Sequence, residues 1–291
     1  MMTNNNKIFK TTMYFLAMVF VFSSCDKLAR PKLGDYPKDA AAPGGPLKFY
    51  VAFDGTTADP LMNAVDSIRA NFPSDNPLTQ IEGISGKAVQ GVAAKAVKYA
   101  GANDFATSTS FSISMWIKNT PWSGGPEWLM SLTDKDYWHN SAFFWYFEDQ
   151  TQGSTATTAN MKLAIMDQWF TFDGAKLIQK PLFNGQWHQL VIVYDEATSK
   201  LAYYIDGDAL TGLDPSVTDV LNNGAARGKV KFTDASGLGG SLVIGGWNKQ
   251  AGLDGPGDPW INGFTGGMDQ VRLYGKALTA SEVLALYTSK Q

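Results

Sequence analysis

The chain has 291 residues, a formal net charge of −3 and an isoelectric point near 5.4, without any run or stripe of Lys and Arg. This balance argues against a nucleic-acid-binding protein. A histidine-rich metal site is excluded, because His139 and His188 are the only histidines. The 29 glycines, 13 prolines and nine tryptophans favour a loop-rich β protein.

The first 24 residues have the order of a secretory signal peptide. Two lysines precede an apolar run from Met13 to Phe22, and two serines follow that run at once. The run is much shorter than the roughly 20 residues that a helix needs to cross a bilayer. The sequence therefore predicts a leader over residues 1–24.

Cys25 is the only cysteine of the chain, so it cannot form an internal disulfide. Its position after an apolar run and two serines resembles a bacterial lipobox, in which the cysteine receives diacylglycerol. Residues 25–45 are rich in Pro and Gly without apolar periodicity, which predicts a lipidated cysteine followed by a flexible tether. We expect the protein to be anchored to the outer membrane at the cell surface, and the periplasmic face stays open.

Strand-like segments follow the tether, most of them bounded by Gly, Pro, Asn or Asp. They are Phe49–Phe53, Ala88–Val92, Phe111–Ile117, Phe143–Phe147, Lys162–Ile165, Gln189–Tyr194, Leu201–Ile205, Leu242–Gly245 and Gln270–Tyr274. This spacing predicts one all-β domain over residues 46–291, a two-sheet antiparallel sandwich of jelly-roll type. Trp116 and Trp187, at a strand and at a strand entrance, are expected to pack in the core.

Aromatic residues are concentrated in stretches that are otherwise polar or rich in Gly and Pro, and that we expect to be exposed loops. The candidate ligand-binding residues are Trp122, Trp128, Trp138, His139, Trp247, Asn248, Asp258 and Trp260. Indole rings would stack on the C–H face of a sugar, and Asn248, Asp258 and His139 would bind its hydroxyls. The alternative is that these tryptophans cap the ends of the sandwich. Trp247 and Trp260 are the stronger candidates because their loop is so rich in glycine.

The last 28 residues combine a strand and a helix. Val271 and Leu273 alternate with Gln270 and Arg272, which predicts a strand with one buried face. Thr279 stands three residues before Glu282, which is the spacing of a capping box. A short C-terminal helix that buries the side chains of Val283, Leu284 and Leu286 is therefore expected.

In order and spacing, five segments of the chain resemble laminin G-like domains of the concanavalin A-like lectin/glucanase superfamily. They are LKFYVAFDGT, FSISMWIKN, GQWHQLVIVYDEATSKLAYYIDGD, SLVIGGWN and the closing FTGGMDQVRLYGKALTASEVLALYTSKQ. The resemblance extends over Pro46–Tyr287. It implies the concanavalin A-like fold, with a ligand site in the loops at one edge of the sandwich.

The same resemblance implies a structural calcium ion. Calcium prefers carboxylate and carbonyl oxygens, and laminin G-like domains often hold it between the first and the last strand. Asp54 and Asp269 match those two positions, and Asp66 could join them. Without the family, these aspartates would be interpreted as solvated turn residues.

No catalytic residue is expected. A retaining glycoside hydrolase needs two carboxylates about 5 Å apart, and no strand carries a convincing alternation of acids. We therefore expect a tethered, non-catalytic carbohydrate-binding protein that holds polysaccharide for partner enzymes or a transporter, similar to accessory glycan-binding lipoproteins of Bacteroidetes-type polysaccharide utilisation systems. The alternatives are an adhesion module that binds a protein and a divergent glycoside hydrolase that depends on Glu148.

Overall fold

The structure is a computed structural model that describes residues 45–54, 62–65, 77–233 and 240–290. These residues belong to one compact unit. The predicted leader, Cys25, nearly all of the tether and Asp66 lie outside the described residues. Within the described part, every helix is too short or too polar to cross a lipid bilayer.

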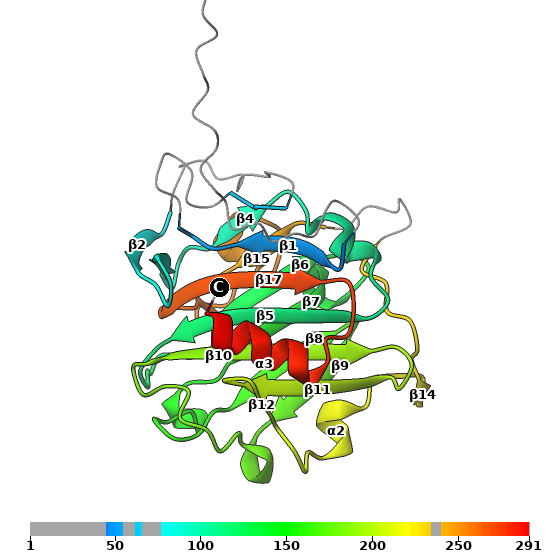
Figure 1. Cartoon of the computed structure of the whole chain (residues 1–291). Coiled ribbons are helices and arrows are strands. Elements are labelled where there is room, and N and C mark those ends of the chain that lie inside the picture. The colour runs from blue at the N-terminus through cyan, green and yellow to red at the C-terminus, as the bar shows by residue number, and fades with distance from the viewer. Residues whose placement is uncertain (1–44, 55–61, 66–76, 234–239, 291) are drawn as a thin grey trace, which may run out of the picture. The chain divides into compact units, whose positions relative to one another are not determined.

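The first of two large sheets contains the first and the last strand of the domain, β1 and β17 (Figure 1). Its strands are antiparallel and follow the order β12–β11–β10–β5–β17–β3–β2, with β1 also paired to β17. Their bounds are β1 Leu47–Val51, β2 Thr79–Glu82, β3 Lys87–Gln90, β5 Phe111–Lys118, β10 Trp187–Asp195, β11 Lys200–Ile205, β12 Asp208–Ala209 and β17 Gly267–Tyr274.

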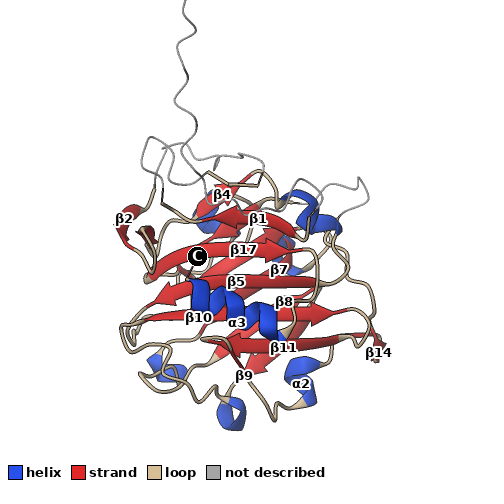
Figure 2. Ribbon diagram, in the orientation of Figure 1, coloured by secondary structure: helices blue, strands red, loops and turns tan. Residues whose placement is uncertain are grey.

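The second sheet follows the order β4–β15–β6–β7–β8–β9, and the short β16 joins β6 in parallel. The bounds are β4 Val97–Tyr99, β6 Glu127–Thr133, β7 Ser141–Phe147, β8 Met161–Ile165, β9 Gln168–Phe172, β15 Leu242–Ile244 and β16 Asn262–Gly263. A separate hairpin pairs β13, Leu221–Asn222, with β14, Ala225–Ala226. Strands dominate the domain and helices are few and short (Figure 2).

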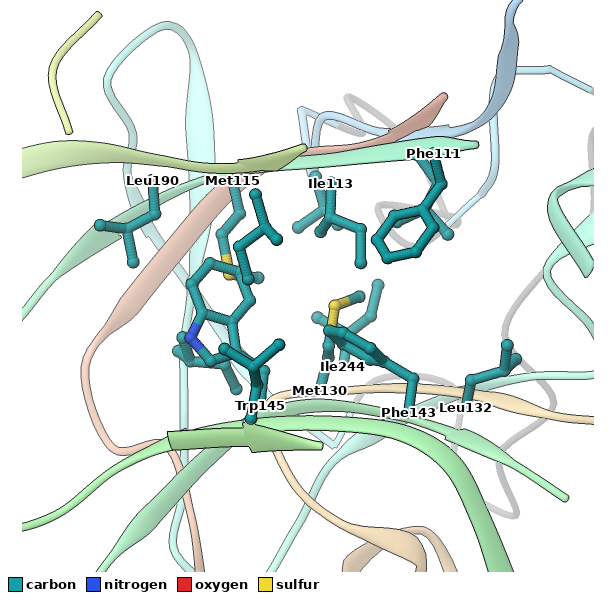
Figure 3. Close-up of a cluster of buried hydrophobic side chains, with 14 of the residues drawn as sticks. Phe111, Ile113, Met115, Met130, Leu132, Phe143, Trp145, Leu190 and Ile244 are labelled. Carbon is teal, nitrogen blue, oxygen red and sulfur yellow. The ribbon is translucent and has the colours of Figure 1, made fainter. Parts of the chain in front are cut away.

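The core lies between the two sheets, and alternate residues of facing strands fill it. Figure 3 shows Phe111, Ile113, Met115 and Leu190 of the first sheet opposite Met130, Leu132, Phe143, Trp145 and Ile244 of the second. All nine are fully buried. The predicted two-sheet antiparallel sandwich is thus the observed fold, and each of the nine predicted strand segments overlaps a strand.

Four strands of the second sheet were not predicted: β4, β6, β9 and the two-residue β16. The omission of β6 matters most, because Trp128 was assigned to a loop and is in fact a strand residue. A register shift between Trp128 and Met130 breaks the alternation of β6, and a Gly/Pro-rich segment precedes it. The pattern that indicates a strand is therefore absent from its sequence.

The helices are short. They are η1 Asn103–Thr107, η2 Trp138–Asn140, η3 Gln150–Gln152, η4 Gly174–Lys176, η5 Asn248–Ala251, α2 Pro215–Thr218 and α3 Ala280–Ser289. The predicted capping box of α3 is present: Glu282 N donates to Thr279 Oγ1 at 3.3 Å, and Thr279 N donates to Glu282 Oε2 at 2.9 Å. Val283 is buried, whereas Leu284, predicted to be buried, is exposed.

Helix α3 lies over the outer face of the first sheet (Figure 1), where Val283 packs with Val191 and Tyr204. Because this face is covered, Gln270 and Arg272 are also buried, and the prediction of one buried face for this strand is wrong. Tyr50 Oη donates to Gln270 Oε1 at 2.6 Å, and the guanidinium of Arg272 lies 4.0 Å from the Tyr50 ring centre.

Candidate functional site

The outer face of the second sheet carries two cross-strand rows of side chains. One row pairs Trp128, Tyr146, Lys162 and Thr171, and the next pairs Ser131, Phe144, Ala164 and Trp169. These residues point away from the core because their chain neighbours, such as Trp145 and Leu163, point into it. The register of β6 to β9 therefore assembles aromatic rings that are far apart in the sequence.

The tryptophans, Phe144 and Tyr146 on this face form one surface, which we call the aromatic platform. Its buried floor consists of Trp128, Phe144, Tyr146 and Trp247. Trp128 stacks on Tyr146 at 4.3 Å between ring centres and on Trp247 at 4.8 Å. Only 1% of Trp128 and of Trp247 is exposed, so the prediction that these rings are exposed is wrong for both.

The rim of the platform consists of three exposed indoles. Trp138 is 45% exposed, Trp169 40% and Trp260 51%. Each rests on the floor: Trp138 lies 5.7 Å from Trp247, Trp169 lies 5.0 Å from Phe144, and Trp260 lies 6.2 Å from Trp128. Trp138 and Trp169 also meet edge to face at 5.4 Å. Trp138 and Trp260 are thus exposed as predicted.

Trp169 was not identified from the sequence. It follows the β8–β9 turn, which uses Met166 and Asp167 at φ 47° and 70° and contains no glycine. The alternation of Trp169 and Thr171 with the buried Phe170 and Phe172 was the signal that could have revealed it.

Two backbone features position Trp138. Its N–H donates to Asp167 Oδ1 at 2.8 Å, which ties η2 to the β8–β9 turn. The following His139 and Asn140 have φ of 51° and 56°, in the left-handed region. The exposed His139 ring lies 3.7 Å from the Trp138 ring and 5.6 Å from that of Trp247, so His139 adjoins the platform. Its contact with sugar hydroxyls stays a prediction.

Asn248 is fully buried, so its predicted contact with ligand hydroxyls is wrong. Its Oδ1 accepts from Ser131 Oγ at 2.9 Å, and its Nδ2 donates to the carbonyls of Asn140 at 3.0 Å and His139 at 3.2 Å. Trp247 Nε1 donates to Ser141 Oγ at 2.8 Å. Both residues therefore fix the loop that supports the platform.

Trp122 belongs to the end of the sandwich. It packs edge to face on Phe183 at 5.1 Å and donates from Nε1 to Gly125 O at 2.9 Å. Asp149 Oδ2 accepts from the N–H groups of Gly124 and Gly125, which holds this loop closed. Trp122 therefore fits the alternative of a cap on the core. Asp258 is exposed two residues before Trp260, and its carbonyl accepts from Ile261 N at 3.3 Å.

An ion pair stands beside the aromatic rings. Lys162 Nζ lies 2.7 Å from Glu148 Oε1, and the two side chains are 21% and 14% exposed. Tyr146 pairs with Lys162 across β7 and β8. Burial, with a smaller effect of the Glu148 carboxylate, raises the pKa of the Tyr146 hydroxyl. The platform thus presents charged hydrogen-bonding groups next to its rings.

Asp54 and Asp269 meet at the β2–β3 turn of the first sheet. Ile84 N donates to Asp269 Oδ2 at 2.8 Å, and Lys87 N donates to Asp54 Oδ1 at 2.6 Å. Asp269 is fully buried, and its Oδ1 has no hydrogen-bond partner among the described residues. Burial and, to a lesser extent, the nearby Asp54 carboxylate raise the pKa of Asp269 to about 8.

This pair of carboxylates suits a hard cation. Within the part of the chain that the structure describes, the buried Asp269 Oδ1 has no hydrogen-bond donor to stabilise an ionised carboxylate. A cation bound there would provide a stabilising positive charge. A Cβ at Gly86 would lie 2.0 Å from Asp54 Oδ1, so glycine is required there. Among the described residues, no three His, Cys, Asp or Glu side chains gather as a metal site.

A family model described as the concanavalin A-like lectin/glucanases superfamily, of laminin G type, matches residues 92–284. Comparison with curated proteins gave no match.

Two solved structures resemble the sandwich. Domain 4 of AbnA, a GH43 extracellular arabinanase from Geobacillus stearothermophilus, in complex with arabinotriose, is 17% identical with a TM-score of 0.50; 83% of this chain and 98% of that domain are covered. A Trypanosoma rangeli sialidase, in a covalent intermediate with difluorosialic acid, is 12% identical with a TM-score of 0.52; 84% of this chain and 33% of the sialidase are covered. At these identities the likeness shows the fold alone, and this chain spans about a third of the sialidase.

Proposed function

Since the chain belongs to the concanavalin A-like lectin/glucanases superfamily, we propose that it is a non-catalytic carbohydrate-binding protein that holds polysaccharide on the aromatic platform. The observation that carries this proposal is the rim of three exposed indoles, Trp138, Trp169 and Trp260, on a buried aromatic floor. Large aromatic rings that are exposed together on one surface indicate a binding site.

The geometry favours a sugar for a physical reason. A pyranose ring has a flat C–H face that stacks on an indole, and its edge carries hydroxyl groups that need polar partners. The platform offers both, because Glu148, Lys162 and His139 adjoin the rings. The rim is also preorganised: the floor and the hydrogen bond from Trp138 N to Asp167 fix the rings before any ligand arrives.

A non-catalytic role is supported by the carboxylate at the platform. A retaining glycoside hydrolase needs two carboxylates about 5 Å apart. Glu148 is instead engaged by Lys162 at 2.7 Å. In this proposal Glu148 recognises the ligand and does not cleave it.

The leader-like residues 1–24 and Cys25 support a location of this function at the cell surface. The signal-like order of residues 1–24 and the lipobox-like Cys25 fit a lipid anchor in the outer membrane, followed by a tether over residues 25–45. We propose that the platform faces the outside of the cell, where it would hold polysaccharide for degrading enzymes or a transporter.

Calcium is the proposed cofactor of the domain. Asp54 and Asp269 would hold it, with Asp66, which lies outside the described residues, as a further candidate. The ion would neutralise two adjacent carboxylates and tie the β2–β3 turn to β17. Thermal melting with calcium and with chelator tests this. We expect a rise in melting temperature with calcium that Asp269→Asn abolishes and Asp258→Asn leaves intact; no shift in the wild type contradicts it.

Affinity electrophoresis through gels that contain neutral and acidic polysaccharides tests the binding function. Arabinan is included, because the arabinanase domain of the same fold is in complex with arabinotriose. We expect the wild type to be retarded without degradation of the polysaccharide, and Trp260→Ala and Trp138→Ala to lose that retardation. Leu221→Ala, an exposed apolar control on β13, should be retarded as the wild type is. Release of reducing ends would indicate a glycoside hydrolase. Absence of retardation in every gel would favour a protein ligand.

A further inference from the structure

The ion pair between Glu148 and Lys162 has a fixed place relative to the exposed ring of Trp169. Lys162 and Ala164 are two residues apart on β8 and point to the same face, and Ala164 pairs with Trp169 on β9. Residues two apart on a strand are separated by about 7 Å. The strand position of Lys162 is therefore a diagonal neighbour of that of Trp169 on the outer face of the second sheet.

Both charged groups are held by the sheet. Lys162 lies between Tyr146 on β7 and Thr171 on β9 in register, and Glu148 follows β7 directly, with its N–H bonded to Asn160 O at 2.9 Å. Each side chain is mostly buried but keeps an exposed fraction, 14% for Glu148 and 21% for Lys162. Such a pair can offer fixed donors and acceptors to a ligand without first being ordered.

Resting on the proposed glycan-binding function, we propose that Glu148 and Lys162 bind neighbouring hydroxyl groups of an uncharged sugar that stacks on Trp169, and thereby make the platform select neutral over acidic polysaccharides. The lysine ammonium donates to one hydroxyl oxygen, and the carboxylate accepts from the next hydroxyl. This pairing of donor and acceptor matches vicinal hydroxyls.

The selection against acidic sugars follows from charge. The ammonium of Lys162 is already compensated by Glu148 at 2.7 Å, so it offers no unpaired cation to a uronate or a sulfate. A ligand carboxylate placed here would meet the Glu148 carboxylate as a like charge. Like-charge contacts disfavour the wrong ligand and leave the neutral one unaffected.

The test compares binding of neutral polysaccharides (arabinan, laminarin, galactomannan) and acidic ones (polygalacturonate, alginate) by affinity electrophoresis. The variants are Glu148→Gln, Lys162→Met and their combination, with Trp169→Ala as a probe of the platform. Lys276→Met is the matched control, because Lys276 pairs with Glu282 at α3 on the opposite outer face. Melting curves verify that each variant is folded.

We expect the wild type to bind a neutral polysaccharide and not the acidic ones. Glu148→Gln and Lys162→Met should each weaken that binding about tenfold, and Lys276→Met should leave it unchanged. If Trp169→Ala loses binding while the ion-pair variants bind as the wild type does, the platform function stands and this inference is overturned. Preference for acidic polysaccharide also overturns it. No binding by the wild type overturns both proposals.

Discussion

The two outer faces of the sandwich are both lined with aromatic rings, but the rings differ in their exposure to solvent. On the first sheet, Trp116 stacks on Tyr287 of α3 at 5.6 Å between ring centres and is fully buried. On the second sheet, Trp128 stacks on Trp247 at 4.8 Å, and the stack continues outward to exposed indoles. Helix α3 packs on the first face and buries its aromatic rings, whereas short loops leave the indoles of the other face half exposed.

The difference separates rings that stabilise from rings that can bind. The C-terminal helix places Val283 and Tyr287 on the first sheet. On the same sheet, Arg272 and Gln270 are buried against Tyr50. The loops at η2 and η5 supply Trp138 and Trp247, and they leave the rim indoles half exposed. An incompletely covered sheet face is therefore the part of this molecule where a ligand can gain buried apolar area.

The largest expected effect is loss of stability in Trp128→Ala. The ring is as buried as that of Trp116, so each substitution should lower the free energy of unfolding by about 3 to 5 kcal/mol, measured by denaturant titration. Trp260→Ala is the matched control and should change stability little. If Trp128→Ala unfolds like the wild type, the floor of the platform is not packed as a core and the comparison of the two faces fails.

The second effect is a pH dependence of stability that arises in the first sheet. The pKa of Asp269 is raised from 3.8 to about 8, so the folded state binds the proton more tightly than the unfolded state does. Without calcium, the contribution of Asp269 to the free energy of unfolding should be greatest below pH 4. It should fall as pH rises toward 8, by at most about 1.4 kcal/mol per pH unit.

Asp269→Asn should flatten that part of the profile, because an amide does not titrate. Melting curves from pH 4 to 8 in chelator provide the measurement. The opposite result is a stability that rises with pH more steeply in the wild type than in Asp269→Asn. It would show that the buried Asp269 carboxylate is already compensated within the fold. Calcium should raise stability most at the alkaline end, where the carboxylate is ionised.

The third effect concerns binding alone. Trp138→Ala, Trp169→Ala and Trp260→Ala should each weaken polysaccharide binding by about 1 to 3 kcal/mol, with little change in melting temperature. Isothermal titration calorimetry with the polysaccharide that is retarded most gives the affinity. Loss of both binding and stability in these variants would mean that the rim is structural, like the floor. Tyr287→Ala, on the covered face, should show the reverse pattern.

Much of the fold could be predicted from the sequence, because most strands keep their own local pattern. β5 alternates apolar residues with Ser112 and Ser114, β10 contains the apolar run Leu190–Tyr194, and α3 has its capping box. β6 and β9 were missed for local reasons: a bulge after Trp128 shifts the alternation, and the turn before Trp169 contains no glycine. Both strands carry platform residues, so these omissions affected the site most.

The site itself was only partly predictable, because exposure depends on partners far away in the chain. Trp247 and Asn248 lie in a Gly-rich segment that reads as an exposed loop, yet Ser131 and Ser141, more than a hundred residues earlier, bind their side chains. Asp54 and Asp269 could be related only through the family resemblance. No local pattern in the sequence brings two such distant carboxylates to one turn.

The smallest expected effect tests whether the cover of the first sheet is independent of the platform. Thr279→Ala removes the side-chain oxygen that accepts from Glu282 N at 3.3 Å, and should lower the free energy of unfolding by about 1 kcal/mol. Thr288→Ala, near the other end of α3, is the matched control and should be close to neutral. Polysaccharide affinity should stay unchanged in both, because α3 packs on the outer face opposite to the platform. A measurable loss of affinity in Thr279→Ala would show that loosening the covered face disturbs the open one, so that the two faces would have to be treated as one coupled structure.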